Sequence, residues 1–207
     1  MTTAAPRSTT LTRRWRHAEP DDRRRLIVEV ALDLLQRRGL EHVTMRRVAH
    51  RLGIGAMTLY TYVDGQDALR RELTRRGFEM IHDTCERYGK ARQPDGGWIE
   101  GARTYLDFAR QNPRLYELMF SIPLTSTPAD REIFDAGFQP LIDLVKQRLS
   151  ARQLPPDELD LLAHKQAAVY WVGLHGLATL AIAGRLDCPE CRPDDLLVDL
   201  LDRIAPD

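Results

Sequence analysis

Residues 43–63 read VTMRRVAHRLGIGAMTLYTYV, a stretch that predicts two short helices joined by a glycine turn. Val48 and Leu52 lie four residues apart and give the first helix one apolar face. Thr44 precedes that face at the position of an N-cap residue. Gly53 follows it, where a residue in the left-handed conformation commonly ends a helix. The first helix is therefore expected to lie between Thr44 and Gly53.

The second helix is expected to begin near Gly55 or Ala56, with Leu59 and Val63 pointing inward. Its other positions carry small or hydroxyl-bearing side chains, which solubility alone does not require. A bracing helix followed by one that can enter the major groove is the arrangement with which a helix-turn-helix reads duplex DNA. An ordinary pair of buried helices is the alternative that this pattern leaves open.

The segments around this pair are also predicted to be helical. Apolar residues recur between Leu26 and Leu35 at the spacing of one helix face, and Gly39 ends that pattern. A further helix is expected from about Gln66 toward residue 88. With these flanks, residues 23–70 resemble the DNA-binding domain of the TetR family of transcriptional regulators. The resemblance rests on VALDLL at 30–35, RGL at 38–40, VTMRRVA at 43–49, LGI at 52–54 and LYTYV at 59–63.

This resemblance implies an all-α protein, with a three-helix helix-turn-helix DNA-binding domain followed by a larger helical domain for effector binding and dimerisation. The expected division is a flexible basic arm over 1–20, the DNA-binding domain over 21–70 and the effector domain over 71–207. The implied function is that of a homodimeric repressor. It would bind a near-palindromic operator in double-stranded DNA and leave it when a small apolar or aromatic effector binds.

The resemblance also implies which residues contact DNA. Arg46 matches a position that can reach a base edge, where bidentate pairing with guanine is its natural chemistry. Thr44 and Tyr60 match phosphate-contacting positions, and Gln66 stands where the family usually carries a lysine. Met45 has a simpler alternative, since it could fill a packing gap. The implied DNA-contacting set is Thr44, Met45, Arg46, Ala56, Met57, Thr58, Tyr60, Thr61, Tyr62 and Gln66.

Charge is distributed unevenly along the chain. The 207 residues have a formal net charge of zero, which alone argues against a nucleic-acid partner. Residues 1–80, however, hold 16 basic and 10 acidic side chains, so the amino-terminal part is the one that would attract a polyanion. Within it, residues 1–20 show no periodic apolar set and are expected to be flexible. Their arginines would form either a solvated tail or an arm that adds DNA contacts.

The carboxy-terminal part is expected to bind the effector between its helices. Trp171, His175 and Gly176 resemble a Trp…His-Gly signature found in one branch of TetR-type effector domains. A lone histidine on an apolar helix is otherwise more often a satisfied core residue. Effector pockets are mostly apolar with a few polar groups, although many aromatic residues would simply be core. The expected lining set is Trp98, Tyr105, Phe108, Tyr116, Met119, Phe120, Phe138, Trp171 and His175.

Residues 167–184 form a long uncharged stretch that is short for a membrane span and is interpreted as a fully buried helix. Its small residues would let another helix approach closely. We therefore expect this helix and the terminal helix over residues 196–204 to pack against their copies across a twofold axis. The small residues concerned are Gly173, Gly176, Ala178, Ala181 and Gly184.

Cysteine usage and the absence of other motifs limit the remaining functions. Three cysteines are too few for a disulfide framework, no signal peptide is recognised, and a cytoplasmic, nucleoid-associated location is expected. Cys188 and Cys191 could instead serve a thiol-redox or metal-dependent protein, which is the alternative function. A helical module that binds only protein is a second alternative. No residues resemble a catalytic constellation, and neither a cofactor nor a metal is expected.

Overall fold

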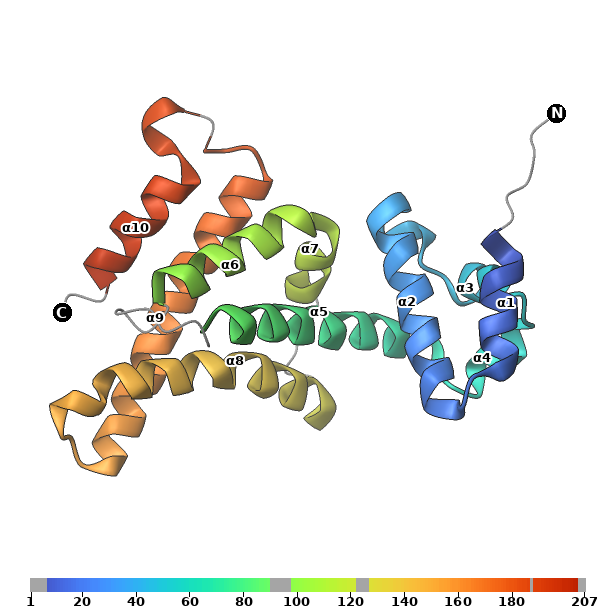
Figure 1. Ribbon diagram of the computed structural model, residues 1–207, viewed down its shortest axis with the longest axis horizontal. Helices are drawn as coiled ribbons and strands as arrows, with labels where there is room; N and C mark the ends of the chain where they lie inside the picture. Colours follow the sequence, from blue (N-terminus) through green and yellow to red (C-terminus); the bar gives the residue numbers. More distant parts are fainter. Residues whose placement is uncertain (1–6, 90–97, 122–126, 187, 205–207) are drawn as a thin grey trace. The chain divides into compact units, whose positions relative to one another are not determined.

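The computed structural model describes residues 7–89, 98–121, 127–186 and 188–204, and these residues form helices with no strand among them. The chain divides into two compact units. We call Met1–Gly77 together with Arg114–Pro123 the N-terminal unit, and Phe78–Pro113 together with Leu124–Asp207 the C-terminal unit. The all-α fold predicted from the sequence is confirmed (Figure 1).

The N-terminal unit contains the helix pair predicted at residues 43–63. It is built from α1 (Arg7–His17), α2 (Pro20–Arg38), the 3₁₀ turn η1 (Leu40–His42), α3 (Met45–Leu52), α4 (Ala56–Tyr60), the first part of α5 (Gly65–Gly89) and α7 (Pro113–Ser121). Helix α3 packs against α1, α2 and α4. The core of the N-terminal unit is aliphatic. Its members that are essentially inaccessible to solvent include Ile27, Ala31, Val48, Leu52 and Leu59.

The C-terminal unit is a layered arrangement around one long helix. It contains the remainder of α5, α6 (Trp98–Gln111), α8 (Pro128–Leu149), η2 (Ser150–Arg152), α9 (Pro156–Ile182), η3 (Pro189–Cys191) and α10 (Pro193–Ile204). Helix α9 packs against α6, α8 and α10, so it is the central helix of this unit. Helix α8 is not divided at Pro140, although a proline inside a helix is expected to bend or break it. Residues 90–97 contain Pro94 and two adjacent glycines, so a connecting loop is expected there, but they lie outside the described residues.

Local capping explains where α3 begins and ends. The Thr44 Oγ1 accepts a hydrogen bond from the backbone N–H of Arg47 at 3.3 Å, so the predicted N-cap is confirmed. At the other end Gly53 adopts φ 71° and ψ 34°, the left-handed conformation in which glycine has no Cβ penalty. Its N–H then closes the last turn on the carbonyl groups of Ala49 and His50.

One carboxylate ties α2 to α3. The two oxygens of Asp33 accept hydrogen bonds from two guanidinium groups, Arg37 Nε at 2.5 Å and Arg51 Nη2 at 2.6 Å. Arg37 lies one turn further along α2, whereas Arg51 lies in the last turn of α3. Asp33 therefore fixes the orientation of the bracing helix relative to the helix before it.

The expectation of a flexible arm over residues 1–20 is wrong for residues 7–17, which form α1. Trp15 is only 6% exposed, and α1 packs against α3 (Figure 1). Leu11 and Trp15 are the only large apolar residues in α1, so the sequence shows no apolar periodicity that would predict this helix. An isolated helix of 11 residues is marginal in water, which means that tertiary packing stabilises this one.

The expectation that residues 167–184 are fully buried is also wrong for this chain. Ala167, Tyr170 and Ala178 are buried, but the opposite face of α9 carries exposed aliphatic side chains. These are Leu161, Val169, Val172 and Leu180, whose exposed fractions run from 46% to 66%. No helix among the described residues has the length and apolar character needed to cross a membrane.

Candidate DNA-binding surface and effector region

The start of α3 presents two exposed arginines beside its cap. Arg46 and Arg47 are both exposed, while Met45 before them is 6% exposed and faces the core. Thr44 is half-buried and uses its hydroxyl oxygen as the cap acceptor, which leaves its O–H free to donate elsewhere. Of the predicted DNA-contacting residues at the start of this helix, Arg46 is exposed and Thr44 is half-buried. The structure assigns Met45 to packing.

Helix α4 exposes the face that the sequence predicted to be groove-facing. Ala56, Met57, Thr58 and Tyr60 are all exposed, with Met57 at 79% and Tyr60 at 50%. Leu59 alone among the residues of α4 is buried, so this short helix is anchored by one side chain. The exposed thioether and phenol on this small helix offer an apolar surface that a partner could cover.

Two further residues of the predicted set have side chains that are already engaged. The Gln66 amide donates a hydrogen bond to the backbone carbonyl of Val43, which ties the start of α5 to the residue before the Thr44 cap. Thr61 is exposed, and its hydroxyl donates to the carbonyl of Thr58 at 2.7 Å. Gln66 therefore makes an internal hydrogen bond at the position where the family that this chain resembles usually carries a lysine.

Tyr62 is held by α1 and α2, an arrangement that the sequence did not predict. Its ring lies edge-on to the indole of Trp15, with 5.3 Å between the ring centroids. Its hydroxyl accepts a hydrogen bond from Arg23 Nη1 at 2.9 Å. The Arg23 guanidinium also lies 5.6 Å from the Trp15 ring centroid and donates from Nε to the Trp15 carbonyl. The Tyr62 side chain therefore packs against α1 and α2.

In the C-terminal unit, four partly exposed ring side chains gather between α8 and α9. Trp171 lies 5.9 Å from Phe134, 5.9 Å from Phe138 and 5.8 Å from His175, measured between ring centroids. Burial lowers the pKa of the His175 imidazole, because removal from water disfavours its charged form. Three members of the predicted effector set, Phe138, Trp171 and His175, are therefore brought together.

The rest of the predicted effector set lies elsewhere. Trp98 packs on Tyr170, with centroids 4.2 Å apart, and Arg148 covers the Trp98 ring at 5.6 Å. Burial raises the pKa of the Tyr170 phenol. Tyr105 is half-buried and Phe108 is 6% exposed, both on α6.

The last three residues of that set belong to α7, which lies in the N-terminal unit. Tyr116 and Phe120 pack on each other with centroids 4.8 Å apart, and Met119 is fully buried. The Met119 thioether lies so close to α5 that a Cβ at Gly77 would overlap its sulfur. These contacts give Tyr116 and Met119 a packing role within the N-terminal unit.

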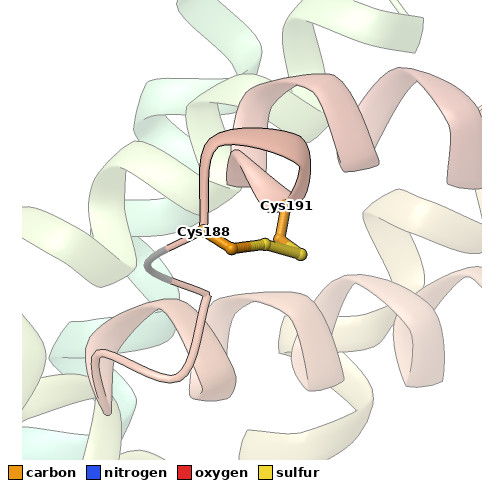
Figure 2. The surroundings of a disulfide bond; sticks show 2 residues. All are labelled: Cys188 and Cys191. Carbon is orange, nitrogen blue, oxygen red and sulfur yellow. A yellow bond between two sulfur atoms is a disulfide. The ribbon is translucent and has the colours of Figure 1, made fainter.

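Cys188 and Cys191 form a disulfide across η3, between α9 and α10 (Figure 2). Their Cα atoms are 5.0 Å apart, and both residues are half-buried. No group of three or more metal-ligating side chains occurs in the part of the chain that the structure describes. The side chain of Cys85 lies outside the described residues.

Comparison with known proteins relates both parts of the chain to one family. Residues 27–73 match the model of bacterial regulatory proteins of the tetR family, and residues 98–204 match the tetracyclin repressor-like C-terminal domain. An HTH-type transcriptional regulator of Mycobacterium tuberculosis is 28% identical over 182 residues, which cover 88% of this chain and 79% of that protein.

Solved structures share the fold over nearly the whole chain. A protein of unknown function from Rhodococcus sp. RHA1 aligns with a TM-score of 0.72 and 22% identity, covering 92% of this chain and 95% of that one. FadR of Thermus thermophilus, a TetR-family repressor solved in complex with lauroyl-CoA, aligns with a TM-score of 0.62 and 21% identity, covering 89% and 98%.

Proposed function

This chain belongs to the TetR family of bacterial transcriptional regulators, and from that premise we propose that it is a homodimeric repressor released from its operator by a small apolar or aromatic effector. The observation that carries the proposal is the exposed face of α4, set on a capped and tightly packed α3. A homodimer would place two such helices on the two halves of a near-palindromic duplex.

Within this surface we assign different roles to different side chains. Arg46 would read a base edge, because its planar guanidinium is suited to bidentate pairing with guanine. Met57 and Ala56 would make apolar contacts, such as those with a thymine methyl group. Thr44, Tyr60 and Thr58 would donate hydroxyl hydrogen bonds to phosphate or base acceptors.

Dimerisation is assigned to the exposed aliphatic face of α9. Its members Leu161, Val169, Val172 and Leu180 are roughly half exposed, so covering each would contribute about 1 kcal/mol. A twofold interface covers each side chain in both protomers, giving roughly 8 kcal/mol, of the order of the cost of association. The terminal helix α10, with half-buried Leu196 and Leu200, is expected to add the remaining area. Ala178 belongs to the protomer's own core and is withdrawn from the proposed interface.

The effector is assigned to the ring cluster of Phe134, Phe138, Trp171 and His175. Ring faces and edges favour flat or apolar ligands, and one imidazole supplies a polar group that can orient them. The lauroyl-CoA bound to Thermus FadR supports an apolar chain as one possible ligand type. To act as an inducer, the ligand must bind the DNA-incompetent form of the dimer more tightly than the competent form.

Selection of bound fragments from the host genome, followed by sequencing, tests the proposal. The expected result is enrichment of a short near-palindromic sequence. The genes next to the bound fragments should suggest the effector, and that effector should abolish binding. Failure to enrich any sequence at modest ionic strength would sink it. The protein is expected to act in the cytoplasm.

The thiol-redox or metal-dependent alternative rests on Cys188 and Cys191 alone. The variant C188S/C191S separates the two functions, because the cysteines lie on η3, away from α3 and α4 in the chain. Unchanged operator binding and unchanged induction in this variant would remove the alternative. Loss of induction with operator binding intact would favour it.

A further inference from the structure

Helix α1 is an addition to the three-helix DNA-binding domain that the sequence predicted. All of its ionisable side chains are basic. Its sequence RSTTLTRRWRH contains four arginines and one histidine but no carboxylate. The described part of the helix buries Trp15 and half-buries Leu11 and Thr12. The side chains of Arg13, Arg14 and Arg16 remain exposed.

Contacts at two points join α1 to the segments that come before and after α4. At one point, Thr12 reaches Gly53 in the turn before α4, so closely that a Cβ on Gly53 would overlap the Thr12 hydroxyl. At the other, Trp15 meets Tyr62, which follows α4. Helix α1 therefore lies across the α3–α4 pair, from the turn before α4 to the segment after it (Figure 1).

The positions of the arginines follow from these contacts. Arg13 is next to Thr12 and Arg16 is next to Trp15, and residues three apart share one helix face. Arg14 lies on another face and forms a paired contact with Glu29 of α2 at 2.9 and 3.0 Å. No ion pair in the described part of the chain involves Arg13 or Arg16. This face therefore carries two guanidinium groups that are not neutralised by the protein itself.

The dimensions of a duplex decide what this face would meet. The major groove is about 12 Å wide, so its phosphate walls lie roughly 6 Å on either side of a helix at its centre. Packed helices lie about 8–10 Å apart, axis to axis. Because α1 packs against α3 and reaches the segments on both sides of α4, it would lie over the phosphate backbone when α4 occupies the groove. Long arginine side chains on that helix can reach phosphate oxygens and release counterions.

We propose that α1 is a second DNA-binding helix of this protein, whose Arg13 and Arg16 bind the phosphate backbone flanking the base pairs that α4 reads. The proposal rests on the proposed DNA-binding function and names a contact surface outside the helix-turn-helix. The cluster of Trp15, Tyr62 and Arg23 fixes α1 in place and so positions both arginines. Phosphate contacts add affinity and salt dependence but no base preference.

The test compares full-length R13A/R16A with the wild type on one selected operator across a range of salt concentrations. Each phosphate contact contributes about 0.9 to the slope of log K against log salt, so the variant should lose roughly 3.6 per dimer. Between about 50 and 200 mM salt the wild type should then lose roughly a hundredfold more affinity than the variant. The base preference should be unchanged.

The charge-matched control is R131A/R152A, which removes two exposed arginines from the C-terminal unit. It should keep the wild-type slope. A second variant, R13Q/R16Q, retains long side chains and removes the charge, so it guards against an effect of truncation on the helix. A wild-type slope in both α1 variants, or an equal fall in the control, overturns the proposal. Wild-type protein that binds no duplex overturns the proposed function as well, whereas an unchanged slope with specific binding intact overturns only the role of α1.

Discussion

Trp15 and Tyr62 meet edge to face, with ring centroids 5.3 Å apart and ring planes at 80°. One ring comes from α1 and the other from the segment that follows α4, 47 positions later in the chain. Arg23 of α2 closes the group by donating a hydrogen bond to the Tyr62 hydroxyl and covering the indole. Two helices and the segment after α4 therefore meet at one side chain, Trp15.

Replacing Trp15 with alanine should release α1 from the N-terminal unit. Truncating a buried tryptophan costs about 3–5 kcal/mol, more than a marginal 11-residue helix can offset. We expect hydrogen exchange at the amides of residues 10–17 to become fast, while α2 and α3 stay protected. The exposed neighbour variant R13A should keep the protection. Slow exchange of α1 in W15A would show that other contacts hold it.

Gly53 should tolerate alanine poorly for two separable reasons. Its φ of 71° disfavours any residue with a Cβ, at a cost of roughly 1 kcal/mol. The added Cβ would also overlap Thr12 Oγ1. The double variant G53A/T12A removes the hydroxyl, so it should recover part of the loss in a chemical-denaturation cycle. Additive effects of the two substitutions would mean that α1 does not approach the turn this closely.

Arg46 and Arg47 are adjacent and both exposed, which makes them a matched pair for operator binding. Arg46→Ala should cost about 1–3 kcal/mol on the cognate operator and relax base preference at one position. Arg47→Ala should leave base preference unchanged. Binding measured on a set of singly substituted operators distinguishes them. A uniform loss across all sequences in R46A would instead assign Arg46 to phosphate.

Val172 is 66% exposed on α9, at the centre of the proposed dimer face. Val172→Glu should therefore leave the protomer folded but bury an unpaired carboxylate at the interface. The expected cost is about 3 kcal/mol or more, over a hundredfold in the dimer Kd. Sedimentation velocity should show monomers at concentrations where the wild type is dimeric. Gln147→Glu, on the exposed surface of α8, adds the same charge and should not change the assembly.

His175 should make the protein less stable in mild acid. Its folded-state pKa lies below the ordinary value of 6.5 because of burial, so the unfolded chain binds the proton more tightly. The stabilisation is fully present above pH 6.5 and is lost as the pH falls from there through the folded-state pKa. Melting temperatures between about pH 8 and 5 should show this loss. His175→Gln should flatten that part of the profile, and an unchanged profile would assign the acid sensitivity to other groups.

The sequence predicted most of the fold because most helices carry their own signals. The Thr44 cap, the Gly53 turn and the apolar face of α2 are local features, and each lies where the pattern indicated. Helix α1 was not predictable in this way. Its formation depends on Trp15 meeting Tyr62 and Arg23, and contacts between distant residues leave no periodic trace in either segment.

The sequence indicated correctly which residues of α4 are exposed, and it did less well where side chains turn inward. Met57 and Tyr60 lie exposed on α4, but Met45 faces the core and Tyr62 packs against α1. Successive residues of a helix point 100° apart, so one can be buried and the next exposed. Family resemblance does not specify in which direction a given side chain points at the end of a helix. In the C-terminal unit the sequence singled out Phe138, Trp171 and His175, which lie together, but missed Tyr170 as the partner of Trp98. Tyr170 looked like one more apolar residue in a long uncharged run.

The carboxylate of Asp33, held by Arg37 and Arg51, also bears on how the protein searches a chromosome. Two guanidinium groups bound to one internal anion are less available to random stretches of duplex. Weak attraction to the many wrong sites would shorten the time spent on each of them. The same carboxylate that stiffens the junction of α2 and α3 would thereby shorten the time that the protein spends on non-specific DNA.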